Sequence, residues 1–295
     1  MSAPSQYYVP EQSHWPIVAT IGLFLTLTGA GTIMIDGRTG QDATLGWLMF
    51  AAGLVVMIYM FFGWFGSVAR ESMAGLYSPQ MDRSFRWGMM WFIFSEVMFF
   101  AAFFGALFYA RFYAVPNLAG DGFHDMTRLL WPEFSANWPL MQNPDPDKFP
   151  GPKQVIEPWT IPLFNTVLLL TSSVTITLSH HALRADKRKA AAGWLALTIG
   201  LGLVFLGFQI EEYLVAYNEY DLTLKSGIYG TTFFMLTGFH GMHVTLGAII
   251  LTVILVRLIK GHFTPDSHFG FEAAAWYWHF VDVVWVCLFV FVYVM

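Results

Sequence analysis

Residues 86–100 read RWGMMWFIFSEVMFF, and this stretch decides the class of fold. An arginine at its start is followed by a long apolar run in which Glu96 is the only charged side chain as far as residue 110. A helix that spans a hydrocarbon core of about 30 Å needs roughly 20 predominantly apolar residues. The segment from about 87 to 111 therefore predicts a transmembrane helix, with Glu96 on the order of 15 Å from the end that Arg86 marks.

Six further segments of the chain satisfy the same requirement for length and apolar character. They cover residues 15 to 35, 44 to 69, 159 to 181, 192 to 216, 228 to 256 and 272 to 295. Over the whole chain 56% of the residues are hydrophobic and only 12% are charged, which leaves too little polar surface for a soluble protein of 295 residues. The sequence therefore predicts an all-α polytopic membrane protein in which seven transmembrane helices form a bundle.

The polar parts of the chain are short except at two places. Residues 1–14 form a polar N-terminal tail without the basic region and cleavage site of a signal peptide, so we expect the first apolar segment to be a retained anchor. Residues 112–158 are rich in Pro, Asn and Asp and predict a long irregular loop. We expect a single membrane domain over residues 15–295.

Lys and Arg are distributed unevenly between the two sets of short loops. One set holds nine of them, whereas the opposite set holds only Arg38 and Lys225. Basic loops are retained on the cytoplasmic side of a membrane. We therefore expect a cytoplasmic N-terminus, an external C-terminus and an external position for the 112–158 loop.

Acidic side chains inside the predicted helices are candidates for function, because a charge in mid-bilayer costs several kcal/mol unless it is neutralised, paired or turned toward protein. Two alternatives remain open for Glu96: a proton-exchanging or regulatory carboxylate, or a neutral acid hydrogen-bonded to a neighbouring helix. Asp282 lies three residues after His279 on the same helix face, and a structural pair is favoured over a proton relay. Glu211 and Glu212 are expected to be anchors near the outer membrane surface.

Two histidines of an apolar helix, His240 and His243, raise the question of a metal site. Histidines on adjacent turns cannot be opposite axial ligands of one haem iron, and they would need His279 or an acid to complete a zinc or copper site. We therefore expect structural roles for them and no bound metal. His180 and His181 are expected at the membrane surface. The sequence shows no nucleotide-binding loop, cysteine cluster or nucleophile motif, and we expect no nucleic-acid partner.

Four residues that can carry positive charge lie at the helix ends expected to be cytoplasmic, on different helices. They are Arg70, Arg257, Lys260 and His262. The general bias of positive charge toward that side explains them, and so does a binding site for an anionic lipid headgroup, so both explanations remain open.

Four long motifs resemble the cytochrome c oxidase subunit III family, in the same order and at similar spacing. They are RWGMMWFIFSEVMFF (86–100), PLFNTVLLLTSSVTITLSHHAL (162–183), GIYGTTFFMLTGFHGMHV (227–244) and FGFEAAAWYWHFVDVVW (269–285). The resemblance covers the chain from about residue 15 and is weakest in the tail and in the loop near 115–155. This loop is longer than in mitochondrial relatives, which indicates a bacterial protein.

The resemblance implies seven helices divided by a V-shaped cleft, with the first two helices on one side, the other five on the other side, and phospholipids inside. By motif, Glu96 corresponds to the carbodiimide-sensitive acid of the family. Glu212 corresponds to the acid of a Gln-x-x-Glu-Tyr stretch, and Glu211 beside it departs from the family pattern. The positions that bind lipid headgroups carry over to Trp64, Arg70, Arg257, Lys260 and His262.

The resemblance also implies the third subunit of an aa3-type cytochrome c oxidase, the terminal respiratory oxidase that transfers electrons from cytochrome c to oxygen and pumps protons. Haem and copper would lie in partner subunits, and oxidase subunits I and II and phospholipids would be the partners of this chain. Its expected role is to support proton uptake, stability and access of lipid and oxygen, in the bacterial inner membrane. Two rival functions are the same subunit of a quinol oxidase, whose relatives typically lack the first two helices, and a proton-coupled transporter that uses Glu96 and Asp282.

Overall fold

The computed structural model describes residues 12–121 and 126–295, and every regular element in them is a helix. Seven of these helices are long and apolar enough to cross a membrane. The predicted fold class, an all-α polytopic membrane bundle, is therefore confirmed. Most of the predicted tail, residues 1–14, lies outside the described residues.

Contacts within the chain divide it into two units, Met1–Phe85 and Arg86–Met295. The first unit contains α1 (Trp15–Thr39), α2 (Thr44–Met73) and the first turns of α3 (Pro79–Tyr109). The division between the units falls close to the one expected between the first two helices and the other five. The lipid-filled cleft stays a prediction.

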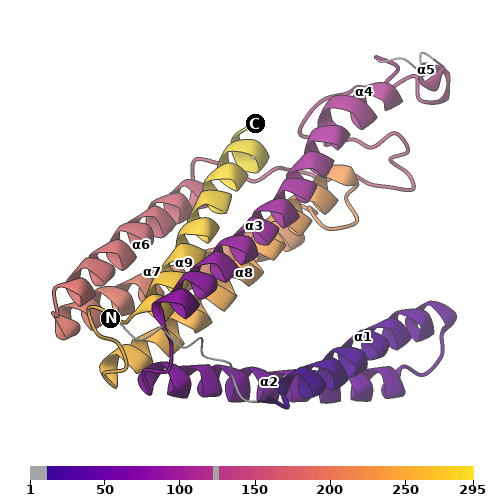
Figure 1. The fold of residues 1–295 in the computed structure, drawn as a ribbon. Helices are drawn as coiled ribbons and strands as arrows, with labels where there is room; N and C mark the ends of the chain where they lie inside the picture. Colours follow the sequence, from indigo (N-terminus) through magenta and orange to yellow (C-terminus); the bar gives the residue numbers. More distant parts are fainter. Residues whose placement is uncertain (1–11, 122–125) are drawn as a thin grey trace. The chain divides into compact units, whose positions relative to one another are not determined.

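The two helices of the first unit, α1 and α2, lie side by side as a hairpin (Figure 1). Gly40 ends α1 with a φ of 70°, a backbone conformation that glycine adopts without strain. Gly29 and Gly53 permit the close approach of the helices, because a Cβ atom at either position would collide with backbone atoms of Phe50 or Thr26.

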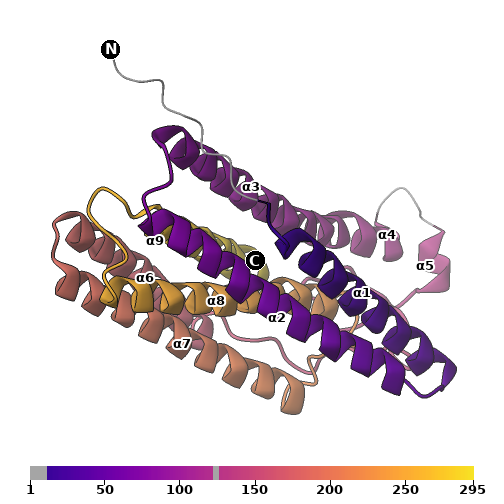
Figure 2. The same ribbon diagram turned by 60° about the horizontal axis from the view of Figure 1, so that its bottom comes forward.

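The second unit contains the rest of α3, a long loop with short helices, and four long helices. The further elements are η1, a π-helical segment (Ala110–Ala114), α4 (Val115–Leu118), α5 (Thr127–Leu130), α6 (Ile161–Arg184), α7 (Arg188–Asn218), α8 (Ile228–Ile259), α9 (Phe269–Leu288) and η2, a second π-helical segment (Phe289–Val294). The long helices α6, α7, α8 and α9 form a bundle in which each packs against the next and α9 returns to α6 (Figure 2).

Two tryptophans of α9 lie in the centre of this bundle, and both are fully buried. The indole nitrogen of Trp278 donates a hydrogen bond to Oγ of Ser172 at 2.9 Å, and that of Trp285 donates to Oγ1 of Thr166 at 2.9 Å. Both acceptors belong to α6, so each tryptophan fills the core with its ring while its polar group is satisfied. These contacts fix α9 against α6.

The helix α3 packs on the bundle through aromatic rings. Phe99 meets Phe239 of α8 edge to face with ring centroids 5.1 Å apart, and Phe100 lies 6.1 Å from Phe280 of α9. These contacts bring the middle of α3, including Glu96, against α8.

Several predicted helix boundaries were too narrow. The third spanning helix begins at Pro79, before the predicted residue 87, and continues through η1 and α4 to Leu118. The long loop therefore begins after Leu118 and not at residue 112. The last helix begins at Phe269, before the predicted residue 272. At the start of the third helix the reason is that hydropathy marks only the apolar part, whereas the polar turns from Pro79 to Arg86 continue the same backbone hydrogen bonding. At the other two ends the added residues are largely apolar, and the charges of Arg111 and Glu272 had marked the boundary too early.

Candidate functional site

The predicted intramembrane acid, Glu96 on α3, contacts His243 on α8. Its Oε2 atom lies 3.0 Å from Nε2 of the histidine, and the two side chains are 22% and 6% exposed. A hydrogen bond to a neighbouring helix is one of the two alternatives that the sequence left open. The proton-exchanging role stays a prediction.

The second ring nitrogen of His243 determines how many protons this pair holds. Nδ1 lies 2.6 Å from the backbone carbonyl oxygen of Phe239, and because a carbonyl oxygen only accepts, Nδ1 carries a hydrogen. One further proton then lies between Nε2 and the oxygen of Glu96. The pair is either a neutral acid that donates to a neutral imidazole or a carboxylate that accepts from an imidazolium, and it is uncharged overall in both forms.

Aromatic rings surround His243 on several sides. The ring centroids of Phe99, Phe100, Tyr277 and Phe280 lie 5.9, 5.0, 6.4 and 6.4 Å from the imidazole centroid. Such an apolar wall strengthens a hydrogen bond and keeps water from competing for it. The Glu96–His243 pair can therefore hold one proton in the middle of a spanning segment at a low cost in free energy, because it carries no net charge.

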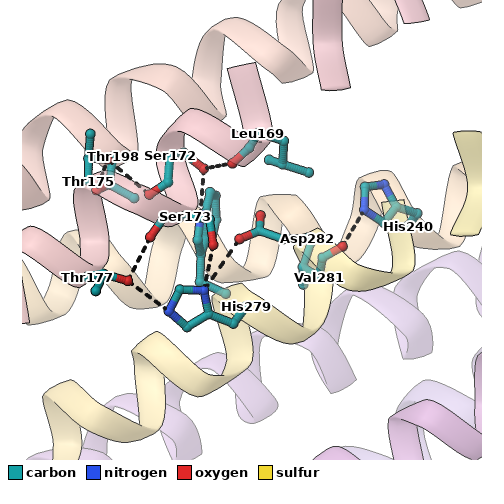
Figure 3. A network of polar contacts seen from close by, with 11 residues as sticks. Leu169, Ser172, Ser173, Thr175, Thr177, Thr198, His240, His279, Val281 and Asp282 are labelled. Carbon is teal, nitrogen blue, oxygen red and sulfur yellow. Dashed lines mark hydrogen bonds and ion pairs between the residues drawn. The ribbon is translucent and has the colours of Figure 1, made fainter. Parts of the chain in front are cut away.

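His240 has a different environment from His243, although both belong to α8. Its Nε2 atom lies 3.2 Å from the carbonyl oxygen of Val281 on α9 (Figure 3), and its ring packs against Phe205 and Trp285. The two histidines therefore face α9 and α3 respectively and do not converge on one ion.

The predicted pair of His279 and Asp282 lies between α9 and α6 (Figure 3). Nδ1 of the histidine is 3.7 Å from Oδ2 of the aspartate and 2.7 Å from Oγ of Ser173 on α6. The carboxylate side chain is only 4% exposed. The two residues share a helix face, as their spacing predicts, and the histidine connects the buried acid to the neighbouring helix.

Glu212 is not a surface anchor, so this expectation was wrong for it. Its Oε1 atom accepts hydrogen bonds from Nε2 of Gln209 at 3.0 Å and from the hydroxyl group of Tyr293 at 2.6 Å. The residue is 2% exposed, whereas its neighbour Glu211 is exposed. Successive helical residues point about 100° apart, so one acid faces the bundle and the other faces outward.

A third group of polar side chains lies where α6 ends and α9 begins. Nε2 of His180 is 3.1 Å from Nε2 of His268 and 3.7 Å from Oε1 of Glu272. Oε1 of Glu272 is also 3.2 Å from Nε2 of His268, and its other oxygen pairs with Arg86. In the part of the chain that the structure describes, this is the one group of His, Cys, Asp or Glu with three ligand atoms close enough to share a metal ion.

A family model described as cytochrome c oxidase subunit III matches residues 5–123 and 146–295. The chain belongs to the cytochrome c oxidase subunit III family. The unmatched residues between these ranges lie in the long loop, where the motif resemblance is also weakest. Similar proteins, all described as cytochrome c oxidase subunit 3, occur in Prototheca wickerhamii (40% identity over 97% of this chain and 96% of the relative), Marchantia polymorpha (39%, over 99% and 97%) and Arabidopsis thaliana (38%, over 97% and 95%).

Membership of the cytochrome c oxidase subunit III family supports the predicted function as the third subunit of this oxidase. Together with the seven spanning helices, it also supports an integral membrane protein that is part of a multi-subunit complex. The rival function of a proton-coupled transporter is not favoured.

The positions that family resemblance assigns to lipid headgroups are distributed over both units. In the first unit, Trp64 is 47% exposed and stacks on Phe65, and the guanidinium group of Arg70 donates to Oγ of Ser67 at 3.0 Å. These side chains lie on α2, toward its C-terminal end.

In the second unit, the lipid positions lie in the last turn of α8 and directly after it. The guanidinium carbon of Arg257 lies 4.6 Å from the ring centroid of Phe263, and Nε of this arginine is buried without a hydrogen-bond partner. Nδ1 of His262 is also buried without a partner, and Lys260 is exposed. The unsatisfied N–H of Arg257 is suited to an acceptor such as a phosphate oxygen, and so is Nδ1 of His262 in the tautomer that carries a hydrogen there.

Sequence reasoning missed the group at the end of α6. It considered His180 only as a surface residue and did not single out His268 or Glu272. The latter two are four residues apart, at the helical spacing of metal-ligating pairs, which is a signal that can be read locally. The position of His180, 88 residues earlier in the chain, could not be inferred in this way.

Proposed function

We propose that this chain is a supporting subunit of an aa3-type cytochrome c oxidase that transfers electrons from cytochrome c to oxygen and pumps protons. In this proposal the chain carries no redox centre, and haem and copper lie in partner subunits I and II. The observation that carries the proposal is the contact between Glu96 and His243, an uncharged acid–base pair that holds one proton inside a spanning segment.

The pair would support proton uptake by subunit I and not the reduction of oxygen itself. Its side chains hold no electrons, and its imidazole nitrogens are engaged with Glu96 and with the Phe239 carbonyl, so they are not free to bind a metal. A carboxyl group that releases and regains a proton inside the spanning segment could pass protons toward subunit I and so sustain turnover when proton supply is limiting.

The test is Glu96→Gln in the assembled oxidase. The amide keeps the size of the side chain and can donate to Nε2 of His243, but it cannot release a proton. We expect unchanged assembly, unchanged haem spectra and an unchanged initial rate of oxygen consumption, followed by earlier loss of activity during sustained turnover. Glu211→Gln, an exposed acid on α7, is the matched control and should behave as the wild type. Abolished oxygen reduction from the first turnover, with normal haem spectra, would replace the supporting role by an obligatory proton relay.

Phospholipid is the second proposed partner. Along the C-terminal half of α8, a groove of about 230 Å³ between α7 and α8 is lined mostly by apolar side chains, among them Leu203, Ile249 and Val253. Lys260 follows Val253 by seven residues, which is two helical turns, and therefore lies on the same face of α8. An acyl chain in the groove would place its headgroup toward this lysine.

The proposed location is the bacterial inner membrane, with the N-terminus in the cytoplasm and the C-terminus in the periplasm. This orientation rests on the excess of Lys and Arg in the loops after α2, α6 and α8. The test starts from a Cys287→Ser variant, in which one cysteine is introduced at Lys187 or at Lys225 and labelled with an impermeant reagent in intact cells. Only the second position should react.

A further inference from the structure

Three side chains that can ligate a metal ion meet where the C-terminal end of α6 lies beside the N-terminal end of α9. His180 belongs to the last turns of α6, His268 is the residue before α9, and Glu272 lies in the first turn of α9. One ligand atom from each lies within 4.8 Å of the other two. The side chains of His180, His268 and Glu272 are 26%, 9% and 16% exposed, so the group is largely buried but remains accessible to solvent.

The distances within this group match those of a tetrahedral site. A zinc ion with nitrogen and oxygen ligands at about 2.0–2.1 Å keeps its ligand atoms about 3.3–3.4 Å apart. The observed separations between Nε2 of His180, Nε2 of His268 and Oε1 of Glu272 are 3.1, 3.2 and 3.7 Å and bracket this value. An ion at normal bond lengths therefore fits among the three atoms without a change of backbone.

Further contacts orient two of the ligands. Nδ1 of His268 lies 3.1 Å from the carbonyl oxygen of Thr264, so it carries a hydrogen and leaves the lone pair of Nε2 directed to the group. Arg86 holds the second oxygen of Glu272 and leaves Oε1 free. A hydrogen bond from the distal nitrogen to a backbone carbonyl is the usual outer contact of a metal-bound histidine, because it fixes the tautomer and the ring orientation.

As hydrogen bonds alone, the group needs an additional proton: His268 would have to be an imidazolium whose Nε2–H points at Oε1 of Glu272, as in one form of the Glu96–His243 pair. With a hydrogen on Nδ1, the neutral ring of His268 presents an acceptor at 3.2 Å from the carboxylate oxygen of Glu272, which is also an acceptor. A single N–H of His180 can point fully at only one of these two atoms. A divalent cation satisfies all three lone pairs at once.

We propose that His180, His268 and Glu272 bind a divalent transition-metal ion of the zinc class, with a water molecule in the fourth position. Two imidazoles and one carboxylate favour zinc over the hard cations calcium and magnesium, which prefer oxygen ligands. The proposal departs from the sequence expectation of a chain without metal, and it does not rest on the role of Glu96. Zinc is redox-inert, so the site adds no electron-transfer centre.

The ion would fasten the end of α6 to the α8–α9 connection and to the start of α9. Arg86 opposes it by its positive charge but shares the carboxylate through the other oxygen, so the site is expected to be weaker than a closed structural zinc site. Three protein ligands with one open position also allow the ion to exchange with the medium.

The experiment uses the intact oxidase complex, stripped with a chelator and titrated with zinc chloride. The variants His180→Gln and His268→Gln each remove one ligand, and His181→Gln, an exposed histidine beside the site, is the matched control. Loss of an outer contact alone weakens metal binding about 10–100-fold, so loss of a ligand should weaken one zinc site at least about 100-fold. The control should retain the wild-type zinc content.

A measurement on the unsubstituted complex keeps the proposal testable if a variant fails to assemble. Zinc should protect His268 from modification by diethyl pyrocarbonate, read by mass spectrometry, and should leave His181 reactive. X-ray absorption of zinc bound at this site should show two imidazole ligands. Equal zinc binding by the wild type and every assembled ligand variant, or no protection of His268 by zinc, would overturn the proposal.

Discussion

Glu96 and His243 lie 147 residues apart in the chain, yet Oε2 of the acid is 3.0 Å from Nε2 of the histidine. The contact joins α3 to α8 in the middle of two spanning helices. Each residue would be costly to bury without the other, because an unpaired ionisable group in hydrocarbon costs several kcal/mol. The two residues are therefore best understood as one unit, and their energetics should be measured together.

Replacing only the histidine should destabilise this unit. His243→Leu leaves the carboxyl group of Glu96 without its partner in an aromatic environment, and a buried polar group without a partner costs about 1–3 kcal/mol. We expect a lower thermal midpoint for loss of this subunit from the detergent-solubilised complex. The double variant Glu96→Leu, His243→Leu removes both polar groups and should recover part of the loss. The single variant Glu96→Leu completes the cycle. If the loss of stability in the double variant equals the sum of the losses in the two single variants, the two side chains are not coupled energetically.

Close helix packing in the first unit depends on two glycines. A Cβ atom at Gly53 would collide with the backbone of Thr26, whereas a Cβ atom at Gly31 meets nothing within 4 Å. Gly53→Val should therefore destabilise the α1–α2 hairpin by about 1–3 kcal/mol or more through overpacking, and Gly31→Val should not. Protease sensitivity of the α1–α2 turn in membranes measures the difference. Equal sensitivity of the two variants would contradict the contact.

The spanning segments could be predicted from sequence because the bilayer imposes one length and one composition on every helix. The helix ends could not: the turns before Arg86 are polar and carry no apolar signal although they are helical, and after Arg111 the charge of this residue and Pro116 suggested an end where the helix continues. Four motifs, among them the one around Glu96, indicated the family, and the comparisons confirm it.

Which side chains meet across neighbouring helices could not be predicted from the sequence. Apolar residues occur on all sides of α7, so the pattern gave no indication that Glu212 faces inward while Glu211 faces outward. The partner of Glu96 depends on how α3 and α8 are rotated about their axes, and no local spacing records such a rotation. By contrast, the pairing of His279 with Asp282 follows from spacing on one helix and could be predicted.

Retention of lipid should depend on Lys260. A basic residue near an anionic lipid surface contributes about 1 kcal/mol, so Lys260→Gln should weaken binding of an anionic phospholipid roughly fivefold. Native mass spectrometry of the complex after detergent washing measures the retained lipid. Lys225→Gln, an exposed lysine in the loop between α7 and α8, serves as the control and should leave it unchanged. The same retained lipid in both variants would remove the argument that Lys260 binds a headgroup.

The C-terminal π-helical segment should be fastened by one hydrogen bond. The hydroxyl group of Tyr293 donates to Oε1 of Glu212 at 2.6 Å, and Oε2 of this buried acid has no hydrogen-bond partner. Tyr293→Phe keeps the ring but leaves Gln209 as the remaining donor, so we expect a loss of about 1–3 kcal/mol. Thermal dissociation of the subunit measures it, with Tyr217→Phe, a 43% exposed tyrosine of α7, as control. If both phenylalanine variants dissociate at the wild-type temperature, the hydroxyl bond contributes nothing, and ring packing alone holds the segment.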